Sequence, residues 1–347
     1  MGKACIAVKS VNSSKTALRR QGEIKEKVYG MKTDERLYHY TNWEGLWGIL
    51  QTQCLWATNY RFMNDDSELL SFKKPLIEVL TTYFKKELDK QLKEHSDANK
   101  FINENGGLDA YSKHLAENWI ENLYNVTGHE FYIASFCGEH NKYINENGLL
   151  SQWRGYGKDG GFALVFNRQK LDEILRLEAE RFNSYYILGP VIYSDEEEKI
   201  YSEMSKIVQY VIKLSLLKMT KGPQQDPETP SSNLIKDTEK TLSKFFCGMS
   251  SYKHCGFREE NEVRIFVWLQ PCRDEVKQDK KLNFRPKNGE YVPYIEIFNT
   301  PDTILPIERI IVGPHKNKKA RADTLSRILK TKSMNIDVTI SDIPYIG

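Results

Sequence analysis

Three short segments, far apart in the chain, carry side chains that could take part in one chemical step. In the first, His39 ends a short predicted strand just before a predicted helix, where its ring can meet a ligand hydroxyl. The second holds Trp153 and Tyr156, three residues apart in a predicted turn, so that both rings could face a planar ligand ring. These residues also have a structural interpretation, as a hydrogen-bonded histidine and as aromatic anchors of the core or of a loop.

The third segment places charges at the start of an apolar strand. Because side chains alternate along a strand, Glu260, Glu262 and Arg264 are predicted to share one face. The apolar run 265–268 follows, and three charges on one strand face are costly to bury unless they line a cleft. The segment therefore predicts either a reactive cleft with two carboxylates or a structural ion pair between Glu262 and Arg264.

The elements that must position these residues are predicted from hydrophobic periodicity. Short strands are expected at 37–41, 54–58, 131–137, 161–166, 263–269, 291–298, 309–312 and 336–340. Amphipathic helices are expected after Asn42 and at 67–94, 108–124, 171–182 and 198–219. Short strands separated by long helices, without βαβ regularity, indicate an α+β fold with a split, mostly antiparallel sheet.

The same periodicity predicts the domain organisation. Residues 1–36 are polar and basic and are expected to form a flexible N-terminal arm, followed by a single domain over 37–347. The amphipathic stretches predict helical insertions into this domain at about 67–128 and 169–248.

Composition excludes several classes of protein. The chain has 347 residues, of which 40% are hydrophobic and 28% charged, which is ordinary globular usage. No apolar run approaches the roughly 18 residues that span a bilayer, and the N-terminus does not resemble a signal peptide, so a cytoplasmic protein without membrane contact is expected. The net charge is +3, and a basic cluster near the C-terminus is either a solvated helix face or a nucleic-acid contact: Lys316, Lys318, Lys319 and Arg321.

Motifs that would indicate common enzyme classes are absent from the sequence. It contains no GxxxxGK[ST], HExxH or GxSxG, which argues against nucleoside triphosphatases, zinc proteases and α/β hydrolases. Residues 155–160 spell GxGxxG, but they precede a predicted strand instead of joining a strand to a helix, so they do not indicate a dehydrogenase. The six cysteines form no zinc-binding spacing, so we expect reduced thiols and no metal. Cys137 follows a predicted strand, but no partner supports it as a nucleophile.

Taken together, these segments resemble a widespread bacterial family, the domain-of-unknown-function family numbered twenty-nine seventy-one. The resemblance covers about 37–312 and rests on five motifs: Tyr38-His39-Tyr40-Thr41, Phe62-Met63-Asn64-Asp65-Asp66-Ser67-Glu68, Ser135-Phe136-Cys137, Trp153-x-x-Tyr156 and Glu260-x-Glu262-x-Arg264. The set is moderately specific, whereas each motif alone is weak.

A more distant resemblance is to ADP-ribosyltransferases of the His-Tyr-Glu type. His39, the pair Ile49-Leu50, Tyr156 and Glu262 would fill the places of that pattern. The sequence departs from it at Tyr40, where the family usually has glycine, and at 53–54, where Gln-Cys replaces the expected glycine. The resemblance implies an ADP-ribosyltransferase-like split sheet and NAD as co-substrate.

The transferase resemblance also implies roles for single residues. Glu262 would be the catalytic carboxylate that stabilises positive charge on the ribose. NAD would be bound by a set of residues from three segments: His39, Tyr40, Thr41, Trp153, Tyr156 and Arg264. Glu260, Asn64 and Asp65 would line the acceptor side, although Asn64 and Asp65 are equally suited to cap the next helix.

The family type implies a toxin or defence effector, with a nucleic acid or protein as acceptor and an antitoxin protein as a possible partner. Two other functions stay open. The pocket could bind a nucleotide or NAD metabolite without turning it over, or the chain could bind nucleic acid through its basic ends.

Overall fold

The structure is a computed structural model. It describes residues 35–63, 67–92, 100, 102–104, 106–126, 131–157, 160–196, 252–269, 276–287, 289–300 and 303–344. Residues 36–347 form one compact unit. The predicted N-terminal arm lies outside the described residues apart from its last two, and so does the helix predicted at 198–219.

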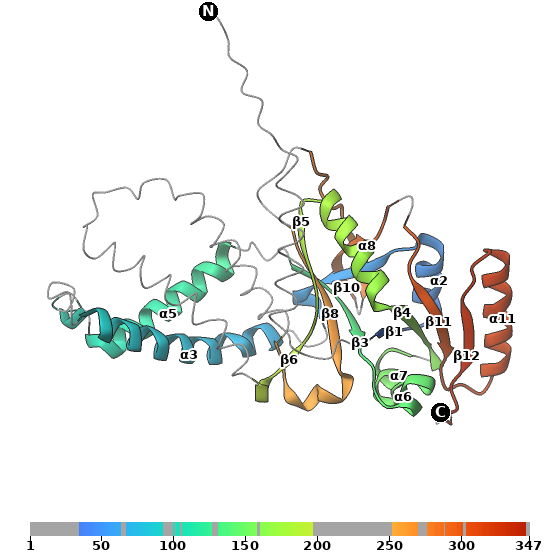
Figure 1. The fold of residues 1–347 in the computed structure, drawn as a ribbon, viewed down its shortest axis with the longest axis horizontal. Helices are drawn as coiled ribbons and strands as arrows, with labels where there is room; N and C mark the ends of the chain where they lie inside the picture. The colour runs from blue at the N-terminus through green and yellow to red at the C-terminus, as the bar shows by residue number, and fades with distance from the viewer. Residues whose placement is uncertain are drawn as a thin grey trace, which may run out of the picture. The chain divides into compact units, whose positions relative to one another are not determined.

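Ten strands of the described part form one sheet (Figure 1). Eight of them follow in the spatial order β12 (Asp337–Ile340), β11 (Ile307–Val312), β4 (Phe162–Asn167), β1 (Arg36–Thr41), β3 (Phe131–Cys137), β2 (Leu55–Asn59), β10 (Glu290–Ile297) and β9 (Leu282–Lys287). β8 (Glu262–Leu269) branches from β3 and pairs on its other edge with β5 (Ser184–Pro190). Only β11 and β12 pair in parallel within this sheet. The predicted α+β class with a mostly antiparallel sheet is confirmed.

The sheet forks at β3. β8 pairs with β3 along its whole length, so β1 and β2 must share the opposite edge. Tyr38 of β1 lies opposite Cys137 at the end of β3, whereas Thr58 of β2 lies opposite Ile133 near its start. The strands diverge between these two pairings.

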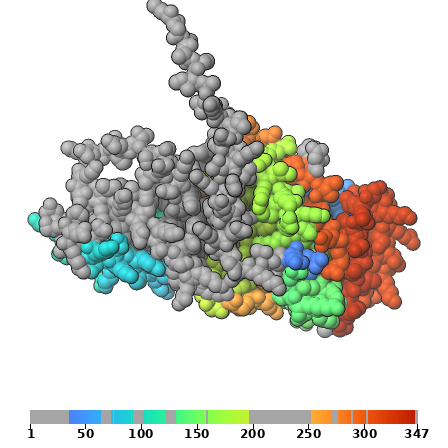
Figure 2. Space-filling model, viewed as in Figure 1, coloured from blue at the N-terminus to red at the C-terminus, as the bar shows by residue number. Residues whose placement is uncertain are grey.

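Helices cover one face of the sheet, here called the α8 face. Apolar residues of α2 (Trp43–Thr52), α8 (Arg168–Arg181) and α11 (Lys318–Thr331) join the main core with alternate strand residues such as Leu164 and Ile265. In Figure 2, α8 and α11 lie at the surface on the viewed side. α2 begins at Asn42, whose side chain accepts from the N–H of Gly45, and it ends at Gln53 in a left-handed conformation. These caps satisfy backbone groups that a helix leaves open at its ends.

The opposite face, here called the α7 face, carries a smaller core under α6 (Lys142–Asn147) and α7 (Leu150–Tyr156). Tyr38, Tyr40, Val165 and Ile311 face this core. The 3₁₀ helix η1 (Tyr60–Phe62) directly follows β2. The other short elements are β6 (Ile192–Tyr193), η3 (Ser194–Glu196), β7 (Tyr252–Lys253) and η4 (Cys255–Glu260), the last of which leads into β8.

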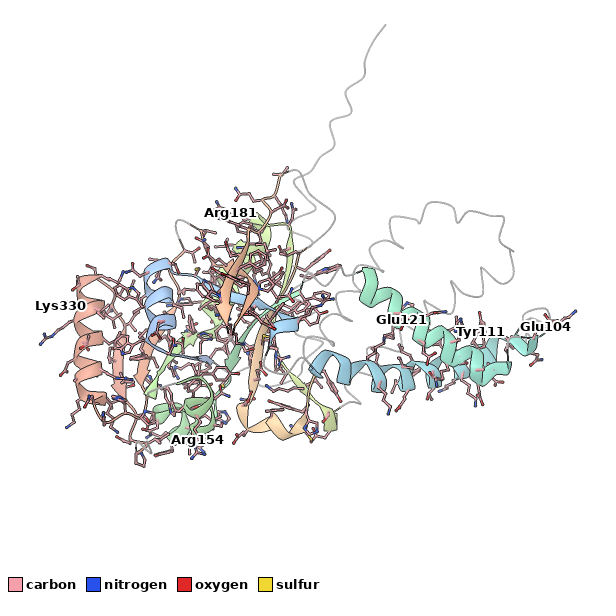
Figure 3. The ribbon with its side chains drawn as sticks, turned by 180° about the vertical axis from the view of Figure 1, so that it is seen from behind. Glu104, Tyr111, Glu121, Arg154, Arg181 and Lys330 are labelled. Atoms are coloured by element: carbon pink, nitrogen blue, oxygen red, sulfur yellow. The ribbon has the colours of Figure 1, made fainter. Side chains whose placement is uncertain are left out.

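Two helices occupy the region of the first predicted insertion. α3 (Ser67–Leu92) and α5 (Gly107–Val126) pack along each other, and Lys73 pairs with Glu121 at 3.3 Å across their interface (Figures 1 and 3). The second predicted insertion is wrong in part, because β5 and β6 interrupt it after α8. Tyr185, Tyr186 and Ile187 favour a strand, and they fill the free edge of β8.

A buried ion pair ties α8 to the end of β10. Glu178 and Lys280 are almost fully buried and form a direct Nζ–Oε1 contact. The same carboxylate accepts from the N–H of Phe298 at 2.9 Å, and Lys280 donates to the carbonyl of Glu296 at 2.8 Å. Burial lowers the pKa of Lys280, although Glu178 opposes this effect. The pair therefore satisfies a buried lysine and the backbone of the turn after β10.

We expect Glu178→Ala to lower the free energy of unfolding by about 3–5 kcal/mol, because it leaves the Lys280 ammonium buried and unpaired. Urea unfolding of the purified variant measures this loss. Arg176→Ala on the same helix removes an exposed pair with Asp172 and should cost less than about 1 kcal/mol. Equal losses in the two variants would contradict the role of the buried pair.

Candidate active site

A buried cluster of two carboxylates and two cations forms at the start of β8. Arg264 donates from Nε to Glu262 Oε1 at 2.7 Å and from Nη2 to Oε2 at 3.0 Å. Both side chains are only 5% exposed. They lie two residues apart in a strand and therefore on one face, as the sequence predicted. The two-pronged contact suits the planar guanidinium and fixes both side chains.

Lys253 joins this pair from β7. Its Nζ lies 2.6 Å from Glu262 Oε2 and 2.8 Å from Glu260 Oε2, so one ammonium bridges both carboxylates. The ring of Phe257 lies 5.0 Å from the same nitrogen. The cluster thus holds two positive and two negative charges, which offset one another in a site with little water.

Glu260 reaches the cluster from a turn, and its predicted place in the strand is wrong. It ends η4, and Asn261 follows in a left-handed conformation with φ 43°. Asn261 fits this position because asparagine tolerates positive φ, and its Nδ2 donates to the carbonyl of Glu139 at 2.9 Å. His254 caps the start of η4 by accepting from the N–H of Gly256. The turn therefore ends where β8 begins, at Glu262.

Glu262 is ionised at neutral pH although it is buried. Burial alone would raise its pKa, but Arg264 and Lys253 outweigh burial and bring the pKa of Glu262 to about 2. Burial likewise acts to lower the pKa of Lys253, and the two carboxylates reverse this and raise it. Glu262 and Lys253 therefore both stay charged over the physiological range.

Two further groups lie beside Glu262. The Tyr193 hydroxyl accepts from the backbone N–H of Glu262 at 3.1 Å. Cys137 lies opposite Glu262 in the neighbouring strand, and burial together with Glu260 and Glu262 raises the pKa of its thiol well above the usual value. Cys137 is thus a protonated packing residue. The sequence missed Tyr193 and Lys253, because strands of two residues carry no periodic signal.

Trp153 and Tyr156 do not face the same way. Trp153 is buried, its indole N–H donates to the carbonyl of Asn147 at 3.0 Å, and its ring meets Tyr40 edge-on at 4.8 Å. The Tyr40 hydroxyl accepts from the N–H of Leu149 at 2.8 Å. Tyr156, at the end of α7, is 45% exposed. Trp153 and Tyr40 are therefore packing residues in this structure, and the prediction that both aromatic rings of the second segment face one ligand is wrong.

His39 and Glu262 lie on opposite faces of the sheet. Tyr38 pairs with Cys137, which pairs with Glu262, so the next residue, His39, points to the other face, and so does Thr41. His39 contacts the ring of Phe136 and donates from Nδ1 to the carbonyl of Ser135 at 3.0 Å. Burial lowers its pKa, so the ring is neutral. The prediction that His39 and Glu262 line one cleft is wrong.

His39 instead lies at the fork of the sheet. Ser135 falls between the part of β3 that pairs with β1 and the part that pairs with β2. The imidazole thus supplies a donor where the strands diverge, which matches the structural interpretation of this histidine.

Other predicted residues lie apart from the cluster or outside the described part. Asn64 and Asp65 are outside the described residues. In the basic cluster near the C-terminus, Lys318 donates to the carbonyl of Ser341 at 2.6 Å, while Lys316 and Lys319 are exposed. Within the described ranges, no three His, Cys, Asp or Glu side chains gather as a metal site would require. Nor does any helix in those ranges combine the length and apolar character needed to cross a bilayer.

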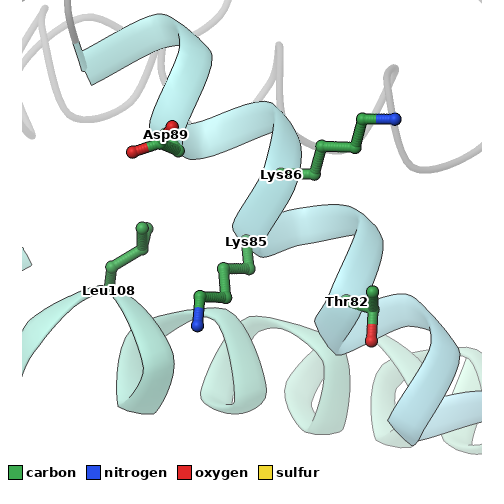
Figure 4. A pocket seen from close by; sticks show the side chains of 5 residues that line it. All are labelled: Thr82, Lys85, Lys86, Asp89 and Leu108. Atoms are coloured by element: carbon green, nitrogen blue, oxygen red, sulfur yellow. The ribbon is translucent and has the colours of Figure 1, made fainter.

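An open groove lies between α3 and α5. It is lined by Thr82, Lys85, Lys86, Asp89 and Leu108, and Lys85 also pairs with Asp109 at 2.5 Å (Figure 4). The groove lies on the helical pair and shares no residue with the cluster around Glu262. Its mixed charges and single apolar side chain give it no evident chemistry.

We expect the stability that Glu262 provides to disappear in acid. Its pKa is 4.5 when unperturbed and about 2 in the folded chain, so its contribution is complete above about pH 4.5 and is lost as the pH falls towards 2. The difference corresponds to about 3 kcal/mol. Urea unfolding of the wild type and of Glu262→Gln should show a gap near pH 7 that narrows below about pH 4.5. A gap independent of pH would contradict the ionised pair.

Comparison with known proteins identifies part of the chain. Residues 152–265 match the model of DUF2971, a family described as a protein of unknown function. No curated protein matches the chain, and no solved structure does. The matched segment contains Trp153, Tyr156, Glu260, Glu262 and Arg264, but not His39. The predicted resemblance to this family is therefore confirmed over residues 152–265, the segment that matches the DUF2971 model.

Proposed function

We propose that the chain is an NAD-dependent ADP-ribosyltransferase in which Glu262 is the catalytic carboxylate. In this reaction the bond between ribose C1′ and the nicotinamide nitrogen breaks, and its electron pair leaves with nicotinamide. A nucleophile of the acceptor then bonds to C1′ and loses its proton. Positive charge builds on the ribose as the bond breaks, so an ionised carboxylate beside the sugar lowers the barrier.

The observation that carries the proposal is the ionised state of a buried glutamate. A carboxylate with a pKa of about 2 is negative at every physiological pH. It acts in a site of low dielectric constant, where its field on a nearby cation is stronger than in water. Arg264 holds both oxygens in place, so little rearrangement is needed during the reaction.

The neighbouring residues receive roles consistent with their positions. Arg264 and Lys253 are positioning residues that keep Glu262 ionised and oriented. Glu260, which is less buried and shares Lys253, is suited to the acceptor side. Tyr156 is the exposed aromatic ring of α7, on the same face of the sheet, and is the candidate to stack on nicotinamide. His39, Thr41, Tyr40 and Trp153 take no direct part in the reaction.

The proposal extends to the role of the reaction in the cell. An enzyme that attaches ADP-ribose to a protein or a nucleic acid alters an essential molecule and consumes NAD. Such an activity suits a toxin or a defence effector, which would need an antitoxin protein to restrain it. This part of the proposal rests on the resemblance to the transferases alone.

One observation favours a second function, a module that binds a nucleotide or NAD metabolite without turnover. Both oxygens of Glu262 are already held, by Arg264 and by Lys253. A carboxylate with two cationic partners has less of its charge to offer to a sugar. In a binding module the same cluster would hold β7, η4 and β8 together beneath the ligand.

Loss of the Glu262 charge should abolish turnover. We expect Glu262→Gln to lower the rate of NAD consumption about 10²–10³-fold per folded molecule, because the amide cannot stabilise the cationic sugar. The release of nicotinamide measures the rate, and circular dichroism at the assay temperature gives the folded fraction. Glu308→Gln, which removes a partly exposed carboxylate paired with Arg36, is the matched control and should keep the wild-type rate.

The same measurements separate the two functions. A Glu262→Gln protein that consumes NAD at the wild-type rate refutes the transferase. A wild-type protein that binds NAD in calorimetry but releases no nicotinamide supports the binding module instead.

A further inference from the structure

Directly after β12, the chain packs into the smaller core of the α7 face (Figure 1). Ser341 is fully buried, and Ile343 is 8% exposed in the same core as Trp153. The N–H of Ser341 donates to the carbonyl of Val312 at 2.9 Å, and its carbonyl accepts from Lys318 Nζ at 2.6 Å. We call residues 341–343 the strap.

Asn147, at the end of α6, binds the strap through two oxygens. Its backbone carbonyl accepts from Ser341 Oγ at 2.7 Å, and its side-chain Oδ1 accepts from the N–H of Asp342 at 2.6 Å. Its Nδ2 donates to the carbonyl of Tyr143 at 3.1 Å. Asn147 is only 5% exposed, so the strap satisfies polar groups that would be costly to leave buried and unbonded.

The same backbone oxygen connects the strap to α7. It also accepts from the indole N–H of Trp153 at 3.0 Å, so Ser341 and Trp153 share one acceptor. Gly148 follows with φ 80°, and a Cβ atom there would lie 2.4 Å from the Trp153 ring. The backbone can pass directly against this ring only because residue 148 is glycine.

α7 is too short to be stable without contacts to the rest of the chain. It has seven residues, and Leu149 at its N-cap makes no side-chain capping bond. Isolated helices of this length do not persist in water. The start of α7 is fixed by the Tyr40 hydroxyl, by the indole bond of Trp153 and, through Asn147, by the strap. The packing of the strap and the order of α7 therefore depend on each other.

We infer that the strap is a conformational device that controls α7, so that the two are docked together or released together. Release would leave Glu262 in place, because the groups that hold it come from β6, β7 and β8. α7 carries Tyr156, the candidate ring for nicotinamide, so release would weaken NAD binding without removing the carboxylate. This effect on NAD rests on the proposed function, whereas the coupling of the strap to α7 does not.

Hydrogen–deuterium exchange of the full chain, without NAD, tests the coupling. Ile343→Asp places a carboxylate in an apolar core and should release the strap. Amides of residues 147–157 should then exchange roughly ten- to hundredfold faster, as expected when the two hydrogen bonds to Asn147 are lost. Peptides from β3 and β8 should exchange as in the wild type. Ile304→Asp is the matched control, because Ile304 is 78% exposed, and it should leave residues 147–157 unchanged.

A milder variant keeps the test valid if Ile343→Asp does not fold. Ser341→Ala keeps the apolar packing and removes the hydroxyl that donates to Asn147 and accepts from the N–H of Ile343 at 3.3 Å. Exchange of residues 147–157 should become about two- to tenfold faster. Ser326→Ala, at an exposed position of α11, should have no such effect. Equal acceleration throughout the chain, or an unchanged rate in residues 147–157, would each overturn the inference.

Kinetics with NAD test the link to the proposed function. Ile343→Asp should raise KM for NAD about two- to tenfold, the effect of one lost ring contact, and should leave kcat per folded molecule close to the wild-type value. Faster exchange of residues 147–157 with an unchanged KM would refute control of the site by the strap.

The two proposals fail separately. A wild type that releases no nicotinamide refutes the transferase, and the exchange experiment still decides whether the strap and α7 are coupled. In that case calorimetry with NAD replaces the kinetics. Ile343→Asp should then bind NAD about two- to tenfold more weakly than Ile304→Asp, and equal affinities would refute control of the site by the strap.

Discussion

Neutralisation of charge at the start of β8 is the constraint on which this part of the structure depends. Glu262 and Arg264 are buried in a strand that is otherwise apolar, so each must find opposite charge within the protein. Arg264 alone would neutralise Glu262. Lys253 also forms an ion pair with Glu262, and its ammonium pairs with Glu260 as well. β7, η4 and β8 are thereby held together over a short stretch of chain, and Tyr193 binds the backbone of Glu262 and adds β6 to the same junction.

The alternation of side chains along the strands decides which groups can meet. The α8 face forms the main hydrophobic core, since three helices bury their apolar sides against it. The Glu262–Arg264 pair lies on the α7 face. His39 is separated from Glu262 by this rule alone, because it lies one residue beyond the residue that faces Cys137. In the transferase pattern, a histidine and a glutamate share one cleft. Here the histidine supports the fork in the sheet, and any catalysis would depend on groups of the α7 face.

Sequence periodicity predicted the strands whose apolar residues alternate or run together, such as β1, β3, β8 and β11. It missed β9, because Pro286 and three lysine or arginine side chains in and beside this edge strand hide the alternation of Leu282 and Phe284. It predicted the pairing of Glu262 with Arg264, since that depends only on a spacing of two in a strand. It could not predict Lys253, whose place is set by a parallel pair of two-residue strands. The burial of Trp153 could not be predicted from the sequence either, because it depends on contact with Tyr40, which lies more than a hundred residues away in the chain.

The geometry of the α7 face limits which groups can act together with the charged cluster. From β8 to β2 the sheet spans two strand spacings, or about 10 Å, and from Cys137 to Ile133 it runs four residues along β3, or about 14 Å. The backbones at Glu262 and Thr58 are therefore about 17 Å apart along one face. A sugar held over β2 would not touch the Glu262 carboxylate. A ribose that reacts at Glu262 must therefore be bound by side chains near the start of β8, where β6, β7 and η4 meet that strand.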